Sequence, residues 1–138
     1  MANEEQLAKV PLFRDLSKKS LSRIAQFARP RSFKAGDVIF KEGEEGVGFF
    51  MVTNGNVVVT RGGTDLANVG SGGFFGEMAL LDNHRRSATV KAVSDTDCLA
   101  LMRSDFLAEL RGNADLAVEM LHVMTARVRS LDEQLTAH

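Results

Sequence analysis

The spacing of hydrophobic positions changes twice along the chain and divides it into three stretches. In the first, apolar side chains recur at the three- and four-residue spacing of one helix face, at Leu21, Ile24, Ala25 and Ala28. Ser17 is placed to cap this helix, and Pro30 to end it, because proline disfavours the helical conformation in the residue before it. We therefore expect N-terminal helices over about residues 4–29, the last of them spanning residues 17–29.

In the second stretch, short apolar runs separated by glycines replace the helical period. Asn54-Gly55 predicts a tight hairpin, because both residue types tolerate the positive φ that such turns require. Many short strands with regular turn signals are typical of a sandwich or barrel. We expect a mainly β fold with flanking helices, in which about eight strands form a double-stranded, jelly-roll-like β-roll over about residues 31–103. The apolar runs are Val38–Phe40, Phe49–Val52, Val57–Val59, Leu66–Val69, Ala88–Val90 and Cys98–Met102.

The helical period returns in the third stretch. Ser104 is placed to cap a short helix over residues 105–110, and Gly112-Asn113 breaks it. A long helix without proline or glycine follows, over about residues 114–135. The chain thus reads as one domain of 138 residues, with C-terminal helices over about residues 104–135.

The long helix carries an apolar seam at three- and four-residue spacing. Such a seam indicates a coiled-coil contact with a second helix. It is equally typical of a helix face packed on the β-roll, and the two can coexist on different faces. A homodimer through the C-terminal helix is therefore one expectation. The seam residues are Ala117, Leu121, Met124, Val128, Leu131 and Leu135.

Composition limits the kinds of binding partner and the cellular compartment that we expect for this chain. The net charge is −1, so no basic field invites direct contact with nucleic acid. No apolar run approaches the ~20 residues of a membrane span, and the polar N-terminus is unlike a signal peptide. Cys98 is the one cysteine and cannot form an internal disulfide, so we expect it to be a small buried side chain in a cytoplasmic protein.

The chemistry gathers in one short segment, Phe75–Val90. Glu77 offers two acceptor oxygens that suit a sugar hydroxyl, and Gly76 beside it lets the backbone approach a ligand. Residues 78–81 are expected to form one helical turn whose free N–H groups attract anions. Arg86 adds a charged planar fork that suits a phosphate, with the Ser87 hydroxyl beside it. A structural salt bridge between Glu77 and Arg86 is the alternative interpretation.

This segment resembles the phosphate-binding cassette of cyclic nucleotide-binding domains, as found in catabolite-activator-type regulators, kinase regulatory subunits and cyclic-nucleotide-gated channels. The family pattern is Phe-Gly-Glu, a small residue two places later, and an arginine nine places after the glutamate, followed by small-Ala-Thr-Val. Here Phe75-Gly76-Glu77, Ala79 and Arg86-Ser87-Ala88-Thr89-Val90 match in register. The resemblance extends over nearly the whole chain, including Ala35-Gly36-Asp37-Val38 upstream.

The resemblance implies a role for each cassette residue. Glu77 would accept the ribose 2′-hydroxyl, supported by the Gly76 N–H. Arg86 would bind the phosphate oxygens, assisted by Ser87 and the Ala79 N–H. The remaining predicted contacts are Phe75 within the cassette, an apolar purine wall of Val69, Met78 and Ala88, and a helical lid carrying Arg127 or Leu131.

One position departs from the family pattern, and a second leaves the choice between cyclic AMP and cyclic GMP undecided. Arg85 stands where many members carry proline, which alters loop stiffness or adds attraction for the phosphate. In the family, threonine directly after the phosphate arginine goes with cyclic GMP and alanine with cyclic AMP. Ser87 lies between the two, and we expect cyclic AMP to be preferred and cyclic GMP to bind more weakly.

The remaining motifs do not point to catalysis or to a cofactor. His84 and His122 lack metal-ligand spacing, and no dinucleotide or Walker fingerprint is present, so we expect no enzyme, metal or cofactor. The chain is expected to relay ligand binding through its C-terminal helices to an unknown effector protein. It is read as a stand-alone sensor or as the sensory part of a transcription regulator lacking its DNA-binding part. The third reading, a non-binding interaction module, is disfavoured by Glu77 and Arg86.

Overall fold

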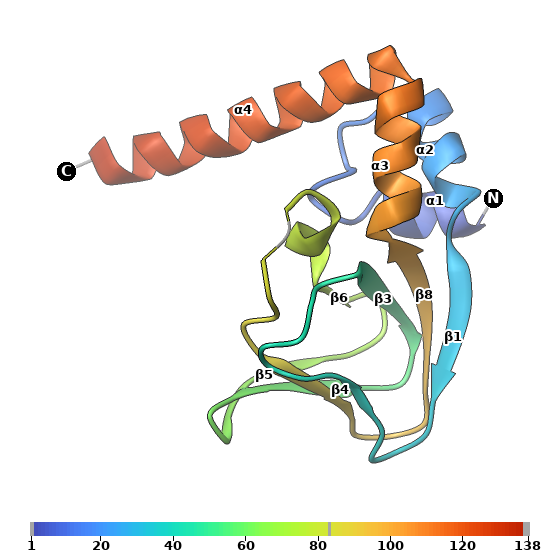
Figure 1. Cartoon of the computed structure of the whole chain (residues 1–138), viewed down its shortest axis with the longest axis vertical. Helices are drawn as coiled ribbons and strands as arrows, with labels where there is room; N and C mark the ends of the chain where they lie inside the picture. The colour runs from blue at the N-terminus through green and yellow to red at the C-terminus, as the bar shows by residue number, and fades with distance from the viewer. Residues whose placement is uncertain (1, 83, 137–138) are drawn as a thin grey trace. The chain divides into compact units, whose positions relative to one another are not determined.

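The computed structural model describes residues 2–82 and 84–136. The described residues contain eight strands, in two four-stranded antiparallel sheets (Figure 1). The strand order is β1-β8-β3-β6 in one sheet and β2-β7-β4-β5 in the other, which confirms the predicted β-roll. The strands are β1 (Arg29–Phe33), β2 (Val38–Phe40), β3 (Gly48–Asn54), β4 (Val57–Arg61), β5 (Thr64–Val69), β6 (Phe74–Phe75), β7 (Thr89–Ala92) and β8 (Thr96–Met102).

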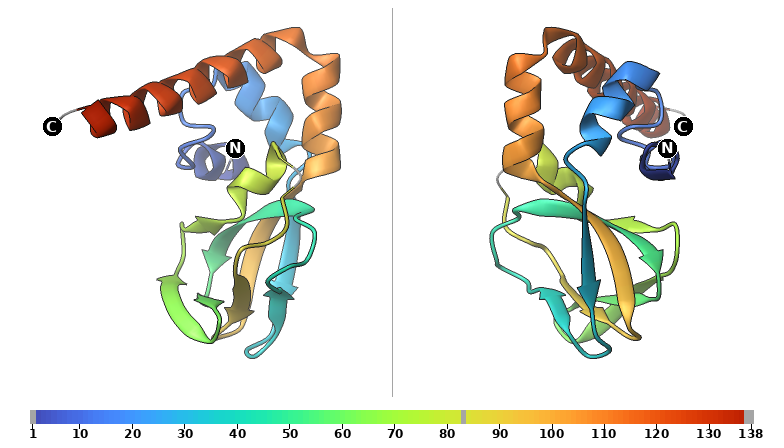
Figure 2. Two further views of the ribbon diagram at one scale, coloured as in Figure 1. Left: turned by 60° about the vertical axis from the view of Figure 1, so that its left-hand side comes forward. Right: turned by 90° about the vertical axis from the view of Figure 1, so that its right-hand side faces the viewer.

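The core of the roll lies between the two sheets, which face one another in Figure 2. Phe50 of β3 and Phe75 of β6 stack at its centre, with ring centroids 5.4 Å apart and an interplanar angle of 15°. Phe40 of β2 packs on both rings from the opposite sheet, at 6.3 Å and 5.8 Å. Truncating a ring of this kind to alanine costs about 3–5 kcal/mol of stability. The aromatic cluster therefore fixes β6, and with it the start of the cassette.

The turn at Asn54-Gly55 forms, but it is not the predicted hairpin. Gly55 has φ +101°, and a Cβ there would lie 2.5 Å from Asp95 O. However, β3 and β4 belong to different sheets, so this turn carries the chain from one sheet to the other. The tight hairpin lies one connection later, where Gly62 and Gly63 join β4 to β5 with φ values of +56° and +81°. Both glycines adopt the positive φ of a two-residue hairpin loop.

The N-terminal helices end earlier than predicted. Helix α2 is Lys18–Ala25, and β1 begins at Arg29, so the prediction of a helix to residue 29 is wrong. Pro30 lies inside β1, opposite Leu99 of β8. β1 is an edge strand, where a residue without an N–H is tolerated, and the residue before a proline favours extended backbone. Proline here excludes a helix and also favours extended backbone at Arg29, the first residue of β1.

The helices form a second compact unit. It contains the described residues of 1–25 and 108–138, and residues 26–107 form the roll. Its α2 is capped as predicted, because the Ser20 N–H donates to Ser17 Oγ at 3.2 Å. The predicted break is confirmed at Asn113, whose Oδ1 caps the long helix by accepting the Leu116 N–H at 3.2 Å. However, α3 extends from Arg103 to Gly112, so Gly112 belongs to the helix, and Ser104 lies inside it instead of capping it. The helices are α1 (Ala2–Leu7), α2, α3 (Arg103–Gly112, shared with the roll) and α4 (Ala114–Thr136).

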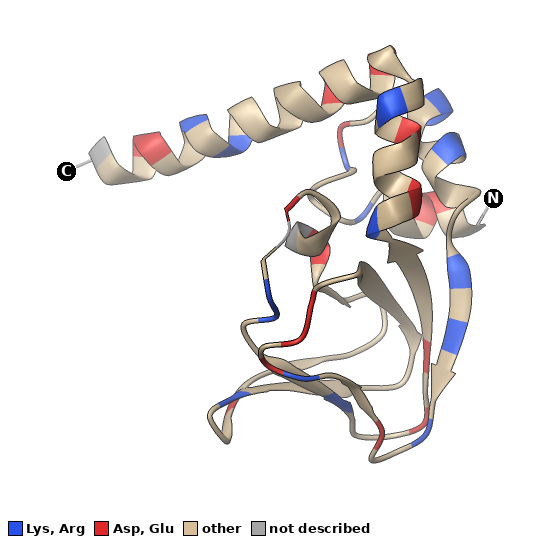
Figure 3. Ribbon diagram, in the orientation of Figure 1, with Lys and Arg blue, Asp and Glu red and all other residues tan. Residues whose placement is uncertain are grey.

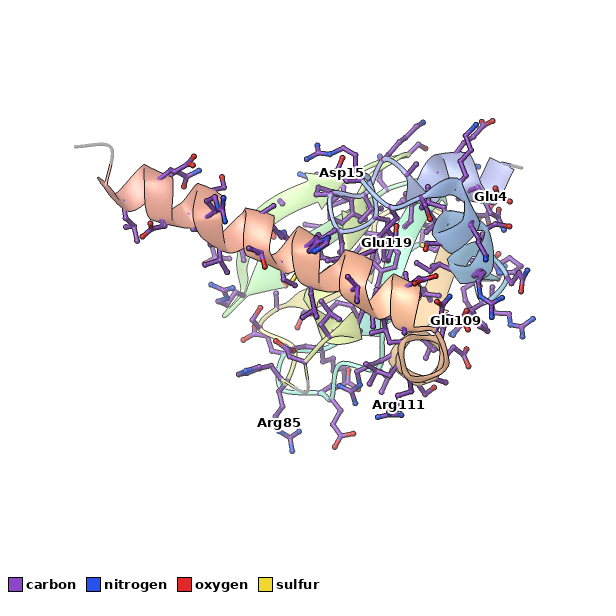
Figure 4. All side chains as sticks on the ribbon, turned by 90° about the horizontal axis from the view of Figure 1, so that it is seen from above. Glu4, Asp15, Arg85, Glu109, Arg111 and Glu119 are labelled. Carbon is purple, nitrogen blue, oxygen red and sulfur yellow. The ribbon has the colours of Figure 1, made fainter. Side chains whose placement is uncertain are left out.

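Two carboxylates join the N-terminal and C-terminal segments within this helical unit. Acidic and basic residues are interspersed along α3 and α4 (Figure 3). Glu119 of α4 accepts the Ser17 N–H at 2.8 Å and the Ser20 hydroxyl, and Glu109 of α3 pairs with Arg23. Both glutamates are labelled in Figure 4. The hydrogen bond from Ser20 lowers the pKa of Glu119 against the opposing effect of burial, and the hydrogen bond from Arg23 lowers that of Glu109. Both carboxylates are thus stabilised in their charged form.

The apolar seam of α4 is largely exposed. Leu121, Val128, Leu131 and Leu135 are 60–79% accessible, and the buried α4 residues Leu116 and Met120 lie on another face. Cys98 is buried, as expected, and burial raises its pKa to about 11. None of the described helices is long and apolar enough to cross a membrane. No group of three or more metal-ligating His, Cys, Asp or Glu side chains gathers among the described residues.

Candidate functional site

The cassette leaves the core as a strand and re-enters it as a strand. After β6 the chain turns at Gly76, forms the 3-10 helix η1 (Glu77–Leu80), and returns to the roll in β7. The predicted helical turn is therefore present, one residue earlier than expected. It is closed by a hydrogen bond from the Ala79 N–H to Gly76 O at 3.1 Å. The buried Phe75 anchors the beginning of this excursion, and the buried Ala88 anchors its end.

A cavity of about 540 Å³ opens beside this segment, and its walls come entirely from the roll. Most of the residues predicted from the sequence line it together. They are Phe75, Gly76, Glu77, Ala79, Arg86, Ser87 and Ala88. The cavity also has residues that the sequence did not single out as ligand contacts, namely Phe40, Val59, Phe74, Asp82, His84, Arg85 and Val90.

Arg86 is the buried cation of this cavity. Its side chain is 8% exposed, and its Nη2 donates to Gly48 O at 2.5 Å. Its guanidinium carbon lies 3.8 Å from the centroid of the Phe40 ring. Burial lowers the pKa of Arg86, an effect opposed by Glu44 and reinforced by Arg103. An arginine remains charged under these conditions, so the cavity holds a poorly hydrated positive charge.

Backbone pairing to the loop between β2 and β3 fixes the position of this arginine. The Arg86 N–H donates to Glu44 O at 2.7 Å, and the Gly43 N–H donates to Arg86 O at 2.9 Å. Arg85 adds a side-chain bond from Nη1 to Gly43 O at 2.8 Å, and its side chain projects outward from the roll (Figure 4). On the other side, Arg61 Nε donates to Ser87 O at 2.9 Å. Arg85 stands where the resemblance leads us to expect proline, and its bond to Gly43 O therefore fixes the cassette against the loop between β2 and β3.

Glycine is required at residue 76. Its φ is +79°, and a Cβ there would lie 2.6 Å from Arg86 Nη1 and 3.2 Å from Gly48 O. A side chain at this position would be strained and would also displace the guanidinium. The short Phe-Gly-Glu sequence thus places the Gly76 backbone and the Arg86 guanidinium side by side.

Two predicted contacts differ from expectation in position or detail, and the contact predicted for a third residue stays a prediction. Val69 packs against the apolar core of the roll and is not among the described residues that line the cavity, where Val59 of β4 takes a place in the wall. The Ala79 N–H, expected to face a phosphate, donates to Gly76 O in this structure. Met78 belongs to η1, but its side chain lies outside the described part of the chain.

The two predicted lid residues lie in the helical unit. Arg127 and Leu131 are both on α4, where they line a hollow of about 350 Å³ together with Arg14 and Asp15. Leu131 is 60% exposed. Their action on a bound purine stays a prediction.

The missed wall residues had no local signal. Phe40 falls in an apolar run that reads as an ordinary core strand, and its contact with Arg86 joins segments far apart in the sequence. Val59 and Val90 read in the same way. A sequence pattern shows that such residues are apolar, but which of them face a cavity depends on the pairing of β2, β7 and β4.

Comparison with known proteins agrees with this geometry. Residues 30–113 match the family model described as the cyclic nucleotide-binding domain. The cyclic AMP receptor protein of Thermus thermophilus is 36% identical over 130 residues, which cover 91% of this chain and 60% of that protein. A cyclic nucleotide-gated potassium channel of Rhizobium etli is 40% identical over 104 residues, covering 75% of this chain and 29% of the channel.

The fold has a similar counterpart among solved structures. The N-terminal domain of a transcriptional regulator from Streptomyces coelicolor superposes with a TM-score of 0.85 at 28% identity, covering 93% of this chain and 95% of that domain. By contrast, the chain spans 60% of the Thermus protein and less than a third of the channel. The similarity therefore concerns one module of these longer proteins.

Proposed function

Since the chain belongs to the cyclic nucleotide-binding domain family, we propose that its cavity binds a cyclic nucleotide, with cyclic AMP preferred over cyclic GMP. The observation that carries this proposal is the buried Arg86, a fixed positive charge in a cavity that also contains Glu77. Burial strengthens the attraction of such a cation for a phosphate, because less water competes for it.

Each part of the nucleotide meets a suitable group in this proposal. Arg86 binds the exocyclic phosphate oxygens, and the exposed Ser87 hydroxyl adds a donor. The carboxylate of Glu77 accepts the ribose 2′-hydroxyl. The Ala79 N–H joins the phosphate contacts when η1 adjusts, because it now closes that turn on Gly76 O. The purine lies against apolar wall residues such as Ala88.

Ser87 carries the nucleotide preference. Ser87 directly follows Arg86 and lines the cavity, and its side chain is smaller than the threonine associated with cyclic GMP in the family. We therefore expect cyclic AMP to bind more tightly. Competition titration measures the ratio directly, and Ser87→Thr should shift it toward cyclic GMP while Ser87→Ala shifts it away. Tighter binding of cyclic GMP by the wild-type chain would contradict this preference.

The output of binding is proposed to pass through the C-terminal helices. Ligand changes their arrangement only if it binds one arrangement better than another. Arg127 or Leu131 of α4 would cover the purine in the favoured arrangement. Alanine at each position should weaken binding, and unchanged affinity in both variants would remove the lid from the account. We propose a regulatory rather than a catalytic role, since the chemistry gathered in the cavity is that of binding.

The exposed seam of α4 supports a homodimer. Four of its large side chains are 60–79% accessible, and contact with a second α4 would remove them from water. Val128→Asp should then lower the mass seen in sedimentation from dimer to monomer. A monomeric wild-type chain would refute this part of the proposal. An effector protein, or further domains as in the Streptomyces and Thermus relatives, would receive the signal.

Thermal unfolding with and without cyclic AMP tests the proposed function. A ligand at about 100 times its Kd adds about 2.7 kcal/mol to the free energy of unfolding, which raises Tm by about 10 °C. Arg86→Ala should abolish this shift, because it removes charge-assisted hydrogen bonds worth about 1.5–3 kcal/mol each. Arg31→Ala is the matched control, since it removes an arginine that also lies over an aromatic ring, that of Phe33, but does not line the cavity, and it should retain the shift. Equal loss in both variants would contradict the role given to Arg86.

A further inference from the structure

The guanidinium of Arg86 lies in a slot built by an aromatic ring and three glycines. Phe40 covers one face at 3.8 Å. Gly48 accepts a hydrogen bond through its carbonyl, while Cβ atoms on Gly46 and Gly76 would lie 3.6 Å and 2.6 Å from guanidinium atoms. Among the residues that the structure describes, no acceptor bonds Arg86 Nε, although that nitrogen is buried.

We propose that Phe40 is a positioning residue that holds the Arg86 guanidinium in its ligand-binding orientation before the phosphate arrives. The proposal rests on the function proposed above and assigns it a residue from outside the cassette. The ring presents its negative face to the cation, an attraction that is strongest when the cation is poorly hydrated. Phe40 is itself held by Phe50 and Phe75 in the core, so the ring is a rigid support.

The contacts of Arg86 explain why this support matters. One hydrogen bond, to Gly48 O, fixes one end of the guanidinium, but a single bond leaves the plane free to rotate about it. Contact with the ring face sets the orientation of that plane. With Nη2 on Gly48 O and one face on Phe40, the guanidinium plane is fixed, and its remaining N–H donors are held in one orientation in the cavity that Arg86 lines.

The consequence is a lower ordering cost on binding. Without the ring face, the long arginine side chain samples several rotamers, and the nucleotide must select one of them. Immobilising one such side chain weakens binding by about three- to tenfold. The effect should depend on the charge distribution of the ring rather than on its volume, because the cavity keeps the same shape when only that distribution changes.

Site-specific ring fluorination of Phe40 tests this dependence. Fluorine withdraws charge from the ring face with little change in size, so the fold and the apolar wall are preserved. Titration with cyclic AMP should show affinity falling stepwise from the native ring to a singly and then a triply fluorinated ring, by about three- to tenfold in total. Phe40→Tyr keeps the face and should bind nearly as the wild type does.

Phe33 provides the matched control. It packs against the same core cluster and has Arg31 5.5 Å from its ring centroid, but it does not line the cavity. Phe33→Leu should leave the affinity for cyclic AMP unchanged, and Phe40→Leu should lower it. A wild-type chain that binds cyclic AMP with affinity unaffected or increased by fluorination of Phe40 would overturn this inference alone. A wild-type chain that binds no cyclic nucleotide would overturn the proposed function as well.

Discussion

Replacing Gly76 with alanine separates backbone strain from damage to the site. Residue 76 has φ +79°, where a residue with a Cβ costs about 1–2 kcal/mol. This corresponds to a fall in Tm on the order of 4 °C per kcal/mol. In addition, the new Cβ would lie 2.6 Å from Arg86 Nη1, well inside the ~3.5 Å of an ordinary contact. The guanidinium must therefore move, and we expect Arg86 to bind the phosphate of the nucleotide more weakly.

The loss of affinity can be estimated from the contact that is displaced. A hydrogen bond to a charged group contributes about 1.5–3 kcal/mol, so losing one weakens binding of cyclic AMP roughly 10- to 100-fold. Gly36→Ala is the control, because Gly36 has φ +93° and open space around the added Cβ. It should lower Tm to a similar extent and leave the affinity unchanged.

Calorimetric titration and thermal unfolding of both variants measure the two effects separately. The reasoning predicts two comparable losses of stability and a loss of affinity in Gly76→Ala alone. If Gly76→Ala binds cyclic AMP as tightly as Gly36→Ala does, the Arg86 guanidinium does not need the space that residue 76 leaves, and the geometry argued for the site is refuted.

Three further outcomes follow from contacts elsewhere in the chain. Glu119→Gln should lower Tm at pH 7, and the difference in Tm from the wild type should shrink as pH falls below about 4.3. The reason is that the folded protein depresses the pKa of Glu119, so the carboxylate contributes to stability above that pH and loses this contribution as it protonates. A difference in Tm independent of pH would contradict this. Ser20→Ala should lower Tm in the same pH-dependent way, since its hydroxyl donates to Glu119; an unchanged Tm profile would count against the contact. The Cys98 thiol, with a pKa of about 11, should resist a thiol reagent at pH 8 in the native chain and react after unfolding; rapid native labelling would show that it is not buried.

The parts of the fold that sequence predicts well are those with a local cause. The cap at Ser17 and the break before the long helix act within one helical turn, so their effects are visible in a few consecutive residues. The cassette is also local, because Gly76, Glu77 and Arg86 reach one cavity through a single short excursion of the chain.

The parts that sequence did not predict depend on which segments pair. The Asn54-Gly55 turn has the expected backbone, yet strand pairing makes it a crossover between sheets instead of a hairpin. Pro30 was read as the end of a helix, but pairing with Leu99 places it within an edge strand. Phe40 reads as an ordinary core residue until the roll brings it against Arg86. In each case the local preference of the residue is the predicted one. What the sequence does not show is which distant segment becomes its neighbour in the fold.

Calorimetric titration of the wild-type chain and Arg86→Ala with cyclic AMP tests the central claim most directly. The account predicts one saturable site per chain in the wild type and binding weakened at least about 100-fold in Arg86→Ala, from the loss of two charge-assisted hydrogen bonds. No saturable binding by the wild type, or binding that survives Arg86→Ala undiminished, would contradict it.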